Sequence, residues 1–166
     1  MEKTNTEVNG KISQASIDFL SLNVPILSRL KDKELRIVEK YMQLIDVISG
    51  EVIFQEGDKG DYVFFVLEGS LDVLKKSETG EEIVISTLSR GRSIGEMSVI
   101  DELPRSATVK SRTKATLLTL SRDKFNYILE NHSSIGVKII KGIARLVSLN
   151  LRKTSTKLVD YMLPLV

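Results

Sequence analysis

One segment of the chain combines residue types that can hold a sugar and a phosphate together. It contains Gly95 and Glu96, a short apolar stretch, and then Arg105 followed by the small residues Ser106 and Ala107. An arginine offers a planar fork of N–H donors that suits phosphate oxygens, whereas a carboxylate accepts hydrogen bonds from sugar hydroxyls. An acid and a base nine residues apart on one loop therefore suit a ligand with both a ribose hydroxyl and a phosphate.

The backbone of this segment also favours an anion. Gly95 permits close approach of the main chain to a ligand, because glycine has no side chain in the way. The short apolar stretch that follows Glu96 is long enough for one helical turn, and the amides at the start of a helical turn favour negative charge. Pro104 and the small residues beside Arg105 are typical of a tight anion-binding loop.

Short strands separated by glycine turns surround the segment and must position it. Between residues 44 and 120, β-branched and aromatic runs alternate with seven of the ten glycines. The absence of helices between these strands argues against a parallel sheet, and many short strands with evenly spaced turns favour a β-sandwich, jelly roll or small barrel. The expected strands are Leu44–Ile48, Val52–Phe54, Tyr62–Leu67, Ser70–Leu74, Glu82–Leu88, Ala107–Arg112 and Thr116–Leu120.

Helical patterns flank this β region on both sides. Residues 1–14 are polar and are expected to form a flexible arm, and residues 15–166 are expected to form one domain. Within that domain, residues 15–42 are predicted as helices interrupted at Pro25, residues 43–120 as the β region, and residues 121–162 as C-terminal helices. Ser121 is a plausible N-cap, and a long helix is expected from about Ser134.

The composition excludes several classes of function. The 166 residues include 24 Lys and Arg, 22 Asp and Glu, no cysteine and a single histidine, His132. Disulfide scaffolds and thiol catalysis are therefore excluded, and no metal site is expected. A net charge of +2 gives no strong attraction to nucleic acid or to anionic membranes. The chain lacks an apolar run of bilayer length and a signal-peptide core, so we expect a cytoplasmic protein that does not enter the membrane.

Several motifs in series resemble the cyclic-nucleotide-binding domains of the bacterial cyclic AMP receptor protein and of protein kinase A regulatory subunits. Gly95-Glu96-Met97 and Arg105-Ser106-Ala107 match the phosphate-binding cassette of those domains, with Met97 as a volume-conserving change from leucine. The resemblance covers about residues 24–158, and its motifs occur in the same order as in the family. Three further stretches carry it: residues 24–27, residues 50–58 and residues 66–73.

The resemblance implies an eight-stranded antiparallel jelly-roll barrel with N-terminal helices and a long C-terminal helix. Its cassette would lie at residues 94–108, with Glu96 on the ribose 2′-hydroxyl, Arg105 on the cyclic phosphate and Ser106 beside it. In the bacterial receptor a Thr-Ser pair on the last helix contacts adenine, and Thr154-Ser155 stands in a comparable place here. Gly95, Met97 and Ala107 complete the implied ligand-binding set.

The long C-terminal helix carries two adjoining apolar seams. Seam A keeps an a/d alternation over about three heptads, which favours pairing with a second copy of the helix in a homodimer. A lysine and arginine stripe lies opposite and is interpreted as a solvated face. Seam A comprises Ile140, Ala144, Val147, Leu151, Thr154 and Leu158. Seam B comprises Ile139, Ile143, Leu146 and Asn150.

These patterns favour a stand-alone regulatory sensor of cyclic nucleotides, with cyclic AMP ahead of cyclic GMP, and not an enzyme. No helix-turn-helix pattern follows the long helix, so we expect no DNA binding by this chain alone, and its downstream protein partner is unknown. Two alternatives stay open. One is an interaction module of the same fold that has lost its ligand. The other is a jelly-roll enzyme of the cupin type, for which the single His132 leaves too few metal ligands.

Overall fold

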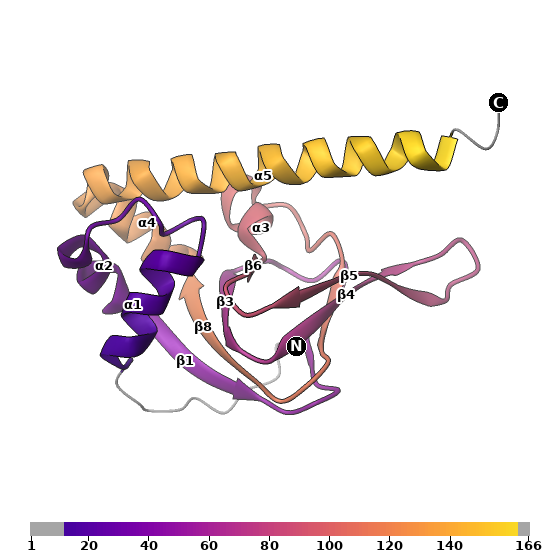
Figure 1. The fold of residues 1–166 in the computed structure, drawn as a ribbon, viewed down its shortest axis with the longest axis horizontal. Helices are drawn as coiled ribbons and strands as arrows, with labels where there is room; N and C mark the ends of the chain where they lie inside the picture. The colour runs from indigo at the N-terminus through magenta and orange to yellow at the C-terminus, as the bar shows by residue number, and fades with distance from the viewer. Residues whose placement is uncertain (1–11, 163–166) are drawn as a thin grey trace.

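The computed structural model describes residues 12–162, with side chains for residues 12–159. Most of the arm expected at residues 1–14 lies outside the described residues. Helices flank a β region and one short helix interrupts it (Figure 1): α1 (Gln14–Asn23), α2 (Asp32–Glu39), α3 (Glu96–Asp101), α4 (Arg122–Asn131) and α5 (Ser133–Met162). The strands are β1 (Met42–Val47), β2 (Val52–Phe54), β3 (Tyr62–Glu68), β4 (Ser70–Lys76), β5 (Glu82–Ser89), β6 (Ser93–Ile94), β7 (Thr108–Ser111) and β8 (Ala115–Ser121).

The eight strands form two four-stranded sheets in which all neighbours are antiparallel. The first sheet has the order β1-β8-β3-β6 and the second has the order β2-β7-β4-β5. Sequence neighbours such as β2 and β3 therefore lie in different sheets, as in a jelly roll. The predicted fold class, mainly β with flanking helices, is confirmed. The described strands make two sheets, however, and not one closed barrel.

Seven of these strands lie where the β-branched and aromatic runs predicted them, with ends that differ by at most two residues. The eighth, β6, was not predicted from those runs. It has only two residues, lies between Gly91 and Gly95, and pairs with β3 through Phe65 opposite Ser93. Such a short strand is defined by its partner and not by its own pattern.

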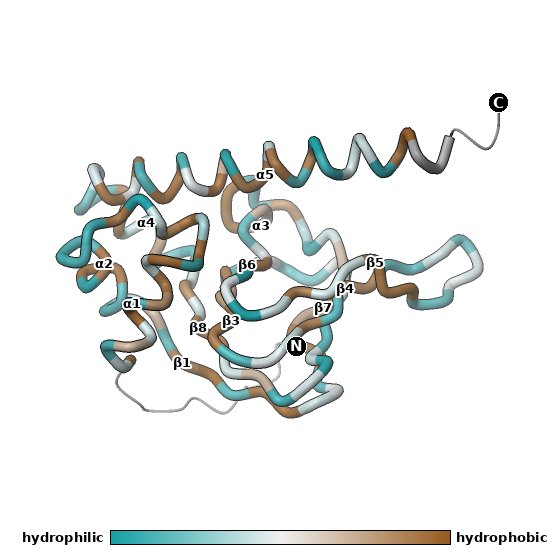
Figure 2. The backbone as a smooth tube through the Cα atoms, viewed as in Figure 1, coloured by the Kyte–Doolittle hydropathy of each residue, from teal (hydrophilic) through white to brown (hydrophobic). Residues whose placement is uncertain are grey.

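Two hydrophobic cores hold the sheets and helices together. Strand β3 contributes to both, because its alternating side chains face opposite sides of the first sheet. Phe64 and Val66 pack into the core between the two sheets. Val63 and Phe65 pack into the core between the first sheet and the helices. The brown segments along β3, β8 and the proximal turns of α5 follow this arrangement (Figure 2).

Helix α5 packs closely against the rest of the domain along only part of its length (Figure 1). In its proximal half, residues 133–146, Ile139, Ile143 and Leu146 are buried in the helical core. Gly142 allows this contact, because a Cβ there would lie 2.4 Å from the Ile26 carbonyl oxygen. In the distal half, residues 147–162, every side chain described is exposed. Seam B therefore faces the core, apart from Asn150, and the side chains of seam A are exposed.

The other helices are set by caps and an ion pair. The Ser121 hydroxyl accepts a hydrogen bond from the Lys124 N–H, which confirms the predicted N-cap of α4. Lys138 on α5 donates to both carboxylate oxygens of Glu34 on α2, at 2.6 and 2.7 Å. The described part of the chain holds no helix that is both long enough and apolar enough to cross a bilayer.

Candidate functional site

A left-handed turn opens the predicted cassette. Gly95 has φ of +86° and directly precedes α3, and a Cβ at this position would lie 2.4 Å from Arg105 Nη1 and 2.8 Å from the Tyr62 carbonyl oxygen. A side chain would therefore strain the backbone and displace the guanidinium. A second close approach lies at Gly60, where a Cβ would overlap the Ser98 side chain. Glycine at both positions lets the β2–β3 loop and α3 close around Arg105.

The Arg105 guanidinium is held in a fixed orientation. Its side chain is 3% exposed, Nη1 donates to the Gly95 carbonyl at 3.1 Å, and Nη2 donates to the Tyr62 carbonyl at 2.8 Å. Its Cζ also lies 4.2 Å from the centroid of the Phe54 ring, a cation–π distance. These contacts fix the guanidinium at this position, and a guanidinium fork suits the oxygens of an anionic ligand.

The carboxylate of Glu96 is buried and only partly satisfied. Glu96 is the first residue of α3 and is 6% exposed. Its Oε2 makes no hydrogen bond within residues 12–162. Burial raises the pKa of Glu96, while its own backbone N–H and the charge of Arg105 act in the opposite direction. A buried acceptor without a donor is destabilising by itself, so this oxygen suits a hydroxyl group brought by a ligand.

Both residues line a cavity of about 570 Å³ between the cassette, the second sheet and α5. The cavity also receives Gly95, Met97, Ser106, Ala107 and Thr154, so seven of the eight residues assigned from the sequence come together. Ser155 does not line it, and its hydroxyl donates to the Leu151 carbonyl of its own helix at 2.9 Å. The ligand contacts of these residues stay predictions, now with a common location.

Sequence reasoning missed other residues of this cavity. Helix α5 contributes Asn150, Lys153 and Lys157 as well as Thr154. Their spacing of three and four residues would have placed them beside Thr154 on one helix face. The contacts of Gly60, Phe54 and Tyr62 around Arg105 had no comparable signal, because they join positions more than 40 residues apart.

Arg122 ties the back of the cassette to α4. Its Nη2 donates to the Gly60 carbonyl at 2.7 Å and to the Ser98 carbonyl at 2.9 Å. The side chain is 14% exposed and also lies near the carboxylates of Asp61 and Glu102, at 3.6 and 3.7 Å. Because Arg122 is the first residue of α4, a shift of α3 would act directly on the helices that follow it.

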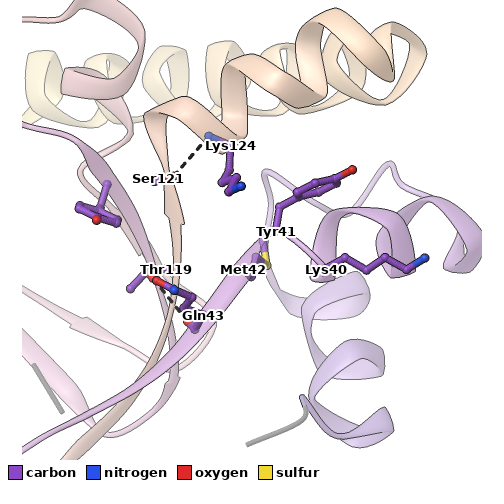
Figure 3. A pocket seen from close by; sticks show the side chains of 8 residues that line it. Lys40, Tyr41, Met42, Gln43, Thr119, Ser121 and Lys124 are labelled. Atoms are coloured by element: carbon purple, nitrogen blue, oxygen red, sulfur yellow. Dashed lines mark hydrogen bonds between the residues drawn. The ribbon is translucent and has the colours of Figure 1, made fainter. Parts of the chain in front are cut away.

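A separate hollow of about 240 Å³ lies between α2, β1 and the start of α4 (Figure 3). The buried Thr119 hydroxyl at this site already donates to the Gln43 carbonyl at 3.5 Å. None of the cassette residues 94–108 lines this hollow. No group of three or more potential metal-ligating side chains was found among the described residues, here or elsewhere. The 570 Å³ cavity is therefore the better candidate for the functional site.

Known proteins with similar sequences and folds share one domain type. A family model of the cyclic nucleotide-binding domain matches residues 45–132, more than half of the chain. The cAMP-dependent protein kinase regulatory subunit of Yarrowia lipolytica is 37% identical over 106 residues, which cover 64% of this chain and 28% of that protein. The lysophospholipase nte1 of Neurospora crassa is 31% identical over 143 residues, which cover 81% of this chain and 9% of that protein.

The structural comparison agrees with the sequence comparison. The crystal structure of a cyclic nucleotide-binding domain from Methylobacillus flagellatus matches with a TM-score of 0.80 at 26% identity, covering 88% of this chain and 85% of that one. The chain spans less than a third of the length of the two sequence relatives, at 28% and 9%. With the matching family model, the jelly-roll topology and the cassette geometry, this chain belongs to the cyclic nucleotide-binding domain family.

Proposed function

We propose that this chain is a regulatory sensor of cyclic nucleotides, with cyclic AMP as its preferred ligand. One observation carries the proposal: a buried arginine fork and a buried carboxylate oxygen without a donor line the same cavity. The arginine fork can donate hydrogen bonds to a phosphate, and the carboxylate oxygen can accept one from a sugar hydroxyl. The likeness to a cAMP-dependent kinase regulatory subunit supports cyclic AMP as the ligand to test first.

Each residue has a distinct role in this proposal. Arg105 binds the cyclic phosphate, assisted by the Ser106 hydroxyl and by backbone amides that the small Ala107 leaves accessible. Glu96 accepts a hydrogen bond from the ribose 2′-hydroxyl. Thr154, on the opposite wall of the cavity, contacts the base. Because each of these groups is assigned a contact with the intact ligand, the proposed role is binding and not catalysis.

The output of the sensor is proposed to be the position of α5. A ligand that touches the cassette and Thr154 at once would favour the arrangement in which both walls contact it, which shifts the population of α5 positions. The distal half of α5 has no buried side chain among residues 147–159 to oppose such a shift. Arg122 offers a second connection, from α3 to α4.

The exposed seam A is proposed to pair with a second copy of the chain. Its members Val147, Leu151 and Leu158 are 39%, 66% and 59% exposed, on a helix face that already has heptad spacing. Contiguous apolar side chains of this size are typical of an interaction surface. In this arrangement the homodimer would rest on the same helix that closes the cavity, so ligand and dimer would be coupled.

Calorimetric titration of the full chain with cyclic AMP, cyclic GMP and linear 5′-AMP tests the proposal. We expect binding of the cyclic nucleotides, tighter for cyclic AMP, and little binding of 5′-AMP. Arg105→Ala should weaken binding by about 1.5–3 kcal/mol, on the order of ten- to a hundredfold in affinity. Arg105→Lys keeps the positive charge and loses the planar fork of donors, so its affinity should lie between those of wild type and Arg105→Ala.

Arg112→Ala is the matched control, because this arginine is 60% exposed and does not line the cavity. Thermal unfolding of each variant separates a lost contact from a lost fold. If the folded wild-type chain binds none of the cyclic nucleotides, the alternative of a ligand-free interaction module replaces this proposal.

A further inference from the structure

A second cavity of about 260 Å³ opens beside the nucleotide cavity, beneath α5. Both cavities are lined by Ser86, Leu88, Asn150, Lys153 and Lys157, so they are neighbours that share a wall. The second cavity extends toward Pro25 and Leu146, beneath the point where the two halves of α5 meet. A ligand larger than one cyclic mononucleotide could therefore extend from one cavity into the other.

Among the described residues, the second cavity is lined by cations and by no acid. Arg92, Lys153 and Lys157 contribute three positive charges, and none of the described residues that line it is Asp or Glu. Within the described residues these three side chains form no ion pair, unlike Lys138 with Glu34. A cyclic mononucleotide carries one negative charge, which Arg105 already matches in the neighbouring cavity. The three additional cations exceed the charge of that ligand.

A buried hydroxyl at the same place provides an independent observation. Ser93 lines the second cavity and is 8% exposed, yet its Oγ has no hydrogen-bond partner within residues 12–162. Pairing of β6 with β3, which sets Ser93 opposite Phe65, holds the residue in place beside the cavity that it lines. A buried hydroxyl without a partner is unfavourable, whereas an anionic oxygen would accept its hydrogen.

We propose that this cavity is an anion subsite that takes a second phosphate beside the nucleotide. The proposal rests on the proposed function, because it assigns the first nucleotide to Glu96 and Arg105. The ligand class that fits is a cyclic dinucleotide, with one nucleotide in the main cavity and its second phosphate among Arg92, Ser93 and Lys153. A separate inorganic anion that binds next to a cyclic mononucleotide has the same chemistry, and the experiment distinguishes the two sources.

Calorimetric titrations of the full chain with cyclic AMP, with cyclic di-AMP, and with pyrophosphate at saturating cyclic AMP test the subsite. Arg92→Ala is the informative variant, because Arg92 lines the second cavity and not the first. Arg152→Ala is the matched control: it removes the same charge from α5 next to Lys153, but Arg152 lines neither cavity. Ser93→Ala tests the hydroxyl without changing the charge.

We expect Arg92→Ala to lower the affinity for cyclic di-AMP by about tenfold, because a charge-assisted contact is lost. The affinity for cyclic AMP should stay unchanged within about twofold. Ser93→Ala should weaken cyclic di-AMP by a smaller factor, and Arg152→Ala should change neither ligand. Added salt should weaken cyclic di-AMP more than cyclic AMP, because more charges are paired. If only pyrophosphate depends on Arg92, the subsite holds and its occupant is a free anion.

Two results would overturn the subsite. If cyclic AMP binds but cyclic di-AMP and pyrophosphate are both insensitive to Arg92→Ala, the cavity is not an anion site and the proposed function stands. If no cyclic nucleotide binds at all, while Arg105→Ala and wild type are equally inert, the proposed function fails and the subsite fails with it.

Discussion

The cassette and the distal half of α5 are opposite walls of one cavity, but the protein holds them very differently. In the cassette, Glu96 and Arg105 are 6% and 3% exposed, and Arg105 is bonded to two backbone carbonyls. On the other wall, Asn150, Lys153 and Thr154 are exposed. The wall proposed to bind the phosphate is thus preorganised by the fold, whereas the wall proposed to contact the base lies on a helix segment that the domain does not bury.

This difference indicates where ligand binding can produce a signal. A preorganised wall loses little freedom when a ligand binds, so it contributes mainly to affinity. A wall that lacks buried contacts can change position at small cost, so it is suited to report the ligand. Variants placed on each wall should therefore separate stability, affinity and response.

The largest expected difference lies between the two halves of α5 itself. Leu146→Ala removes a side chain that is 8% exposed and should lower the free energy of unfolding by about 2–3 kcal/mol. Leu151→Ala removes a side chain that is 66% exposed and should change the free energy of unfolding by less than about 0.5 kcal/mol. Urea unfolding measures both, at concentrations where sedimentation gives a monomer. Equal losses would mean that the distal half packs on the domain.

The second prediction compares two glycines with the same backbone conformation. Gly95 and Gly80 have φ of +86° and +85°, so alanine at either position should destabilise the fold by about 1–2 kcal/mol. Only at Gly95 would the new Cβ meet Arg105, since nothing lies within 4 Å of a Cβ at Gly80. Gly95→Ala should therefore also weaken cyclic AMP by about tenfold or more, the cost of one charge-assisted contact. Calorimetry after correction for the folded fraction measures this, and an equal effect of both variants would contradict it.

The third prediction concerns the charge of Glu96. Burial raises the pKa of Glu96 in the folded chain. The protonated group therefore contributes to the free energy of unfolding below the ordinary glutamate pKa, and this contribution is lost as the pH rises through the raised pKa. Glu96→Gln removes this dependence on pH, because glutamine does not titrate. The stability of the variant relative to wild type should therefore increase with pH, as measured by urea unfolding from pH 4 to 8. A constant difference across this range would show that Glu96 is not held in a desolvating site.

The same variant should have the opposite effect on ligand binding. An ionised carboxylate is a stronger acceptor than an amide, so Glu96→Gln should weaken cyclic AMP by about 1.5 kcal/mol and affect the 2′-deoxy analogue much less. In wild type, the affinity for cyclic AMP should fall as the pH drops through the raised pKa of Glu96. Equal losses for the two ligands would remove Glu96 from the ribose.

The smallest expected effect lies on the α5 wall. Thr154→Val keeps the shape of the side chain and removes the hydroxyl, so it should weaken cyclic AMP by about 1 kcal/mol and narrow the preference over cyclic GMP. Seam A would become wholly apolar, so the dimer should persist or tighten in sedimentation. Ser155→Ala is the control, because its hydroxyl is bonded within the helix and does not line the cavity. A loss with Ser155→Ala in place of Thr154→Val would indicate that α5 rotates when the ligand binds.

Much of the fold and of the cassette could be predicted because the signals are local. The runs that form β3 and β4, the Ser121 cap and the break at Pro25 each depend on a few consecutive residues, whose propensities act over that same distance. Glu96 and Arg105 could be assigned for a similar reason. Their side-chain chemistry, their spacing of nine residues and the neighbouring Gly95 are all visible in one short segment.

Only the tertiary structure decided which apolar seam of α5 would be buried. Both seams have helical periodicity and similar hydrophobicity, and periodicity defines a face without stating what covers it. The choice was made by distant groups: Gly142 lets α5 approach the Ile26 backbone, and this contact turns Ile139 and Ile143 toward the core. The same holds for the carbonyl of Tyr62 on Arg105 and for the hydroxyl of Ser93 beneath α5. A backbone carbonyl is common to every residue, so its placement beside a side chain depends on the path of the whole chain and not on residue type.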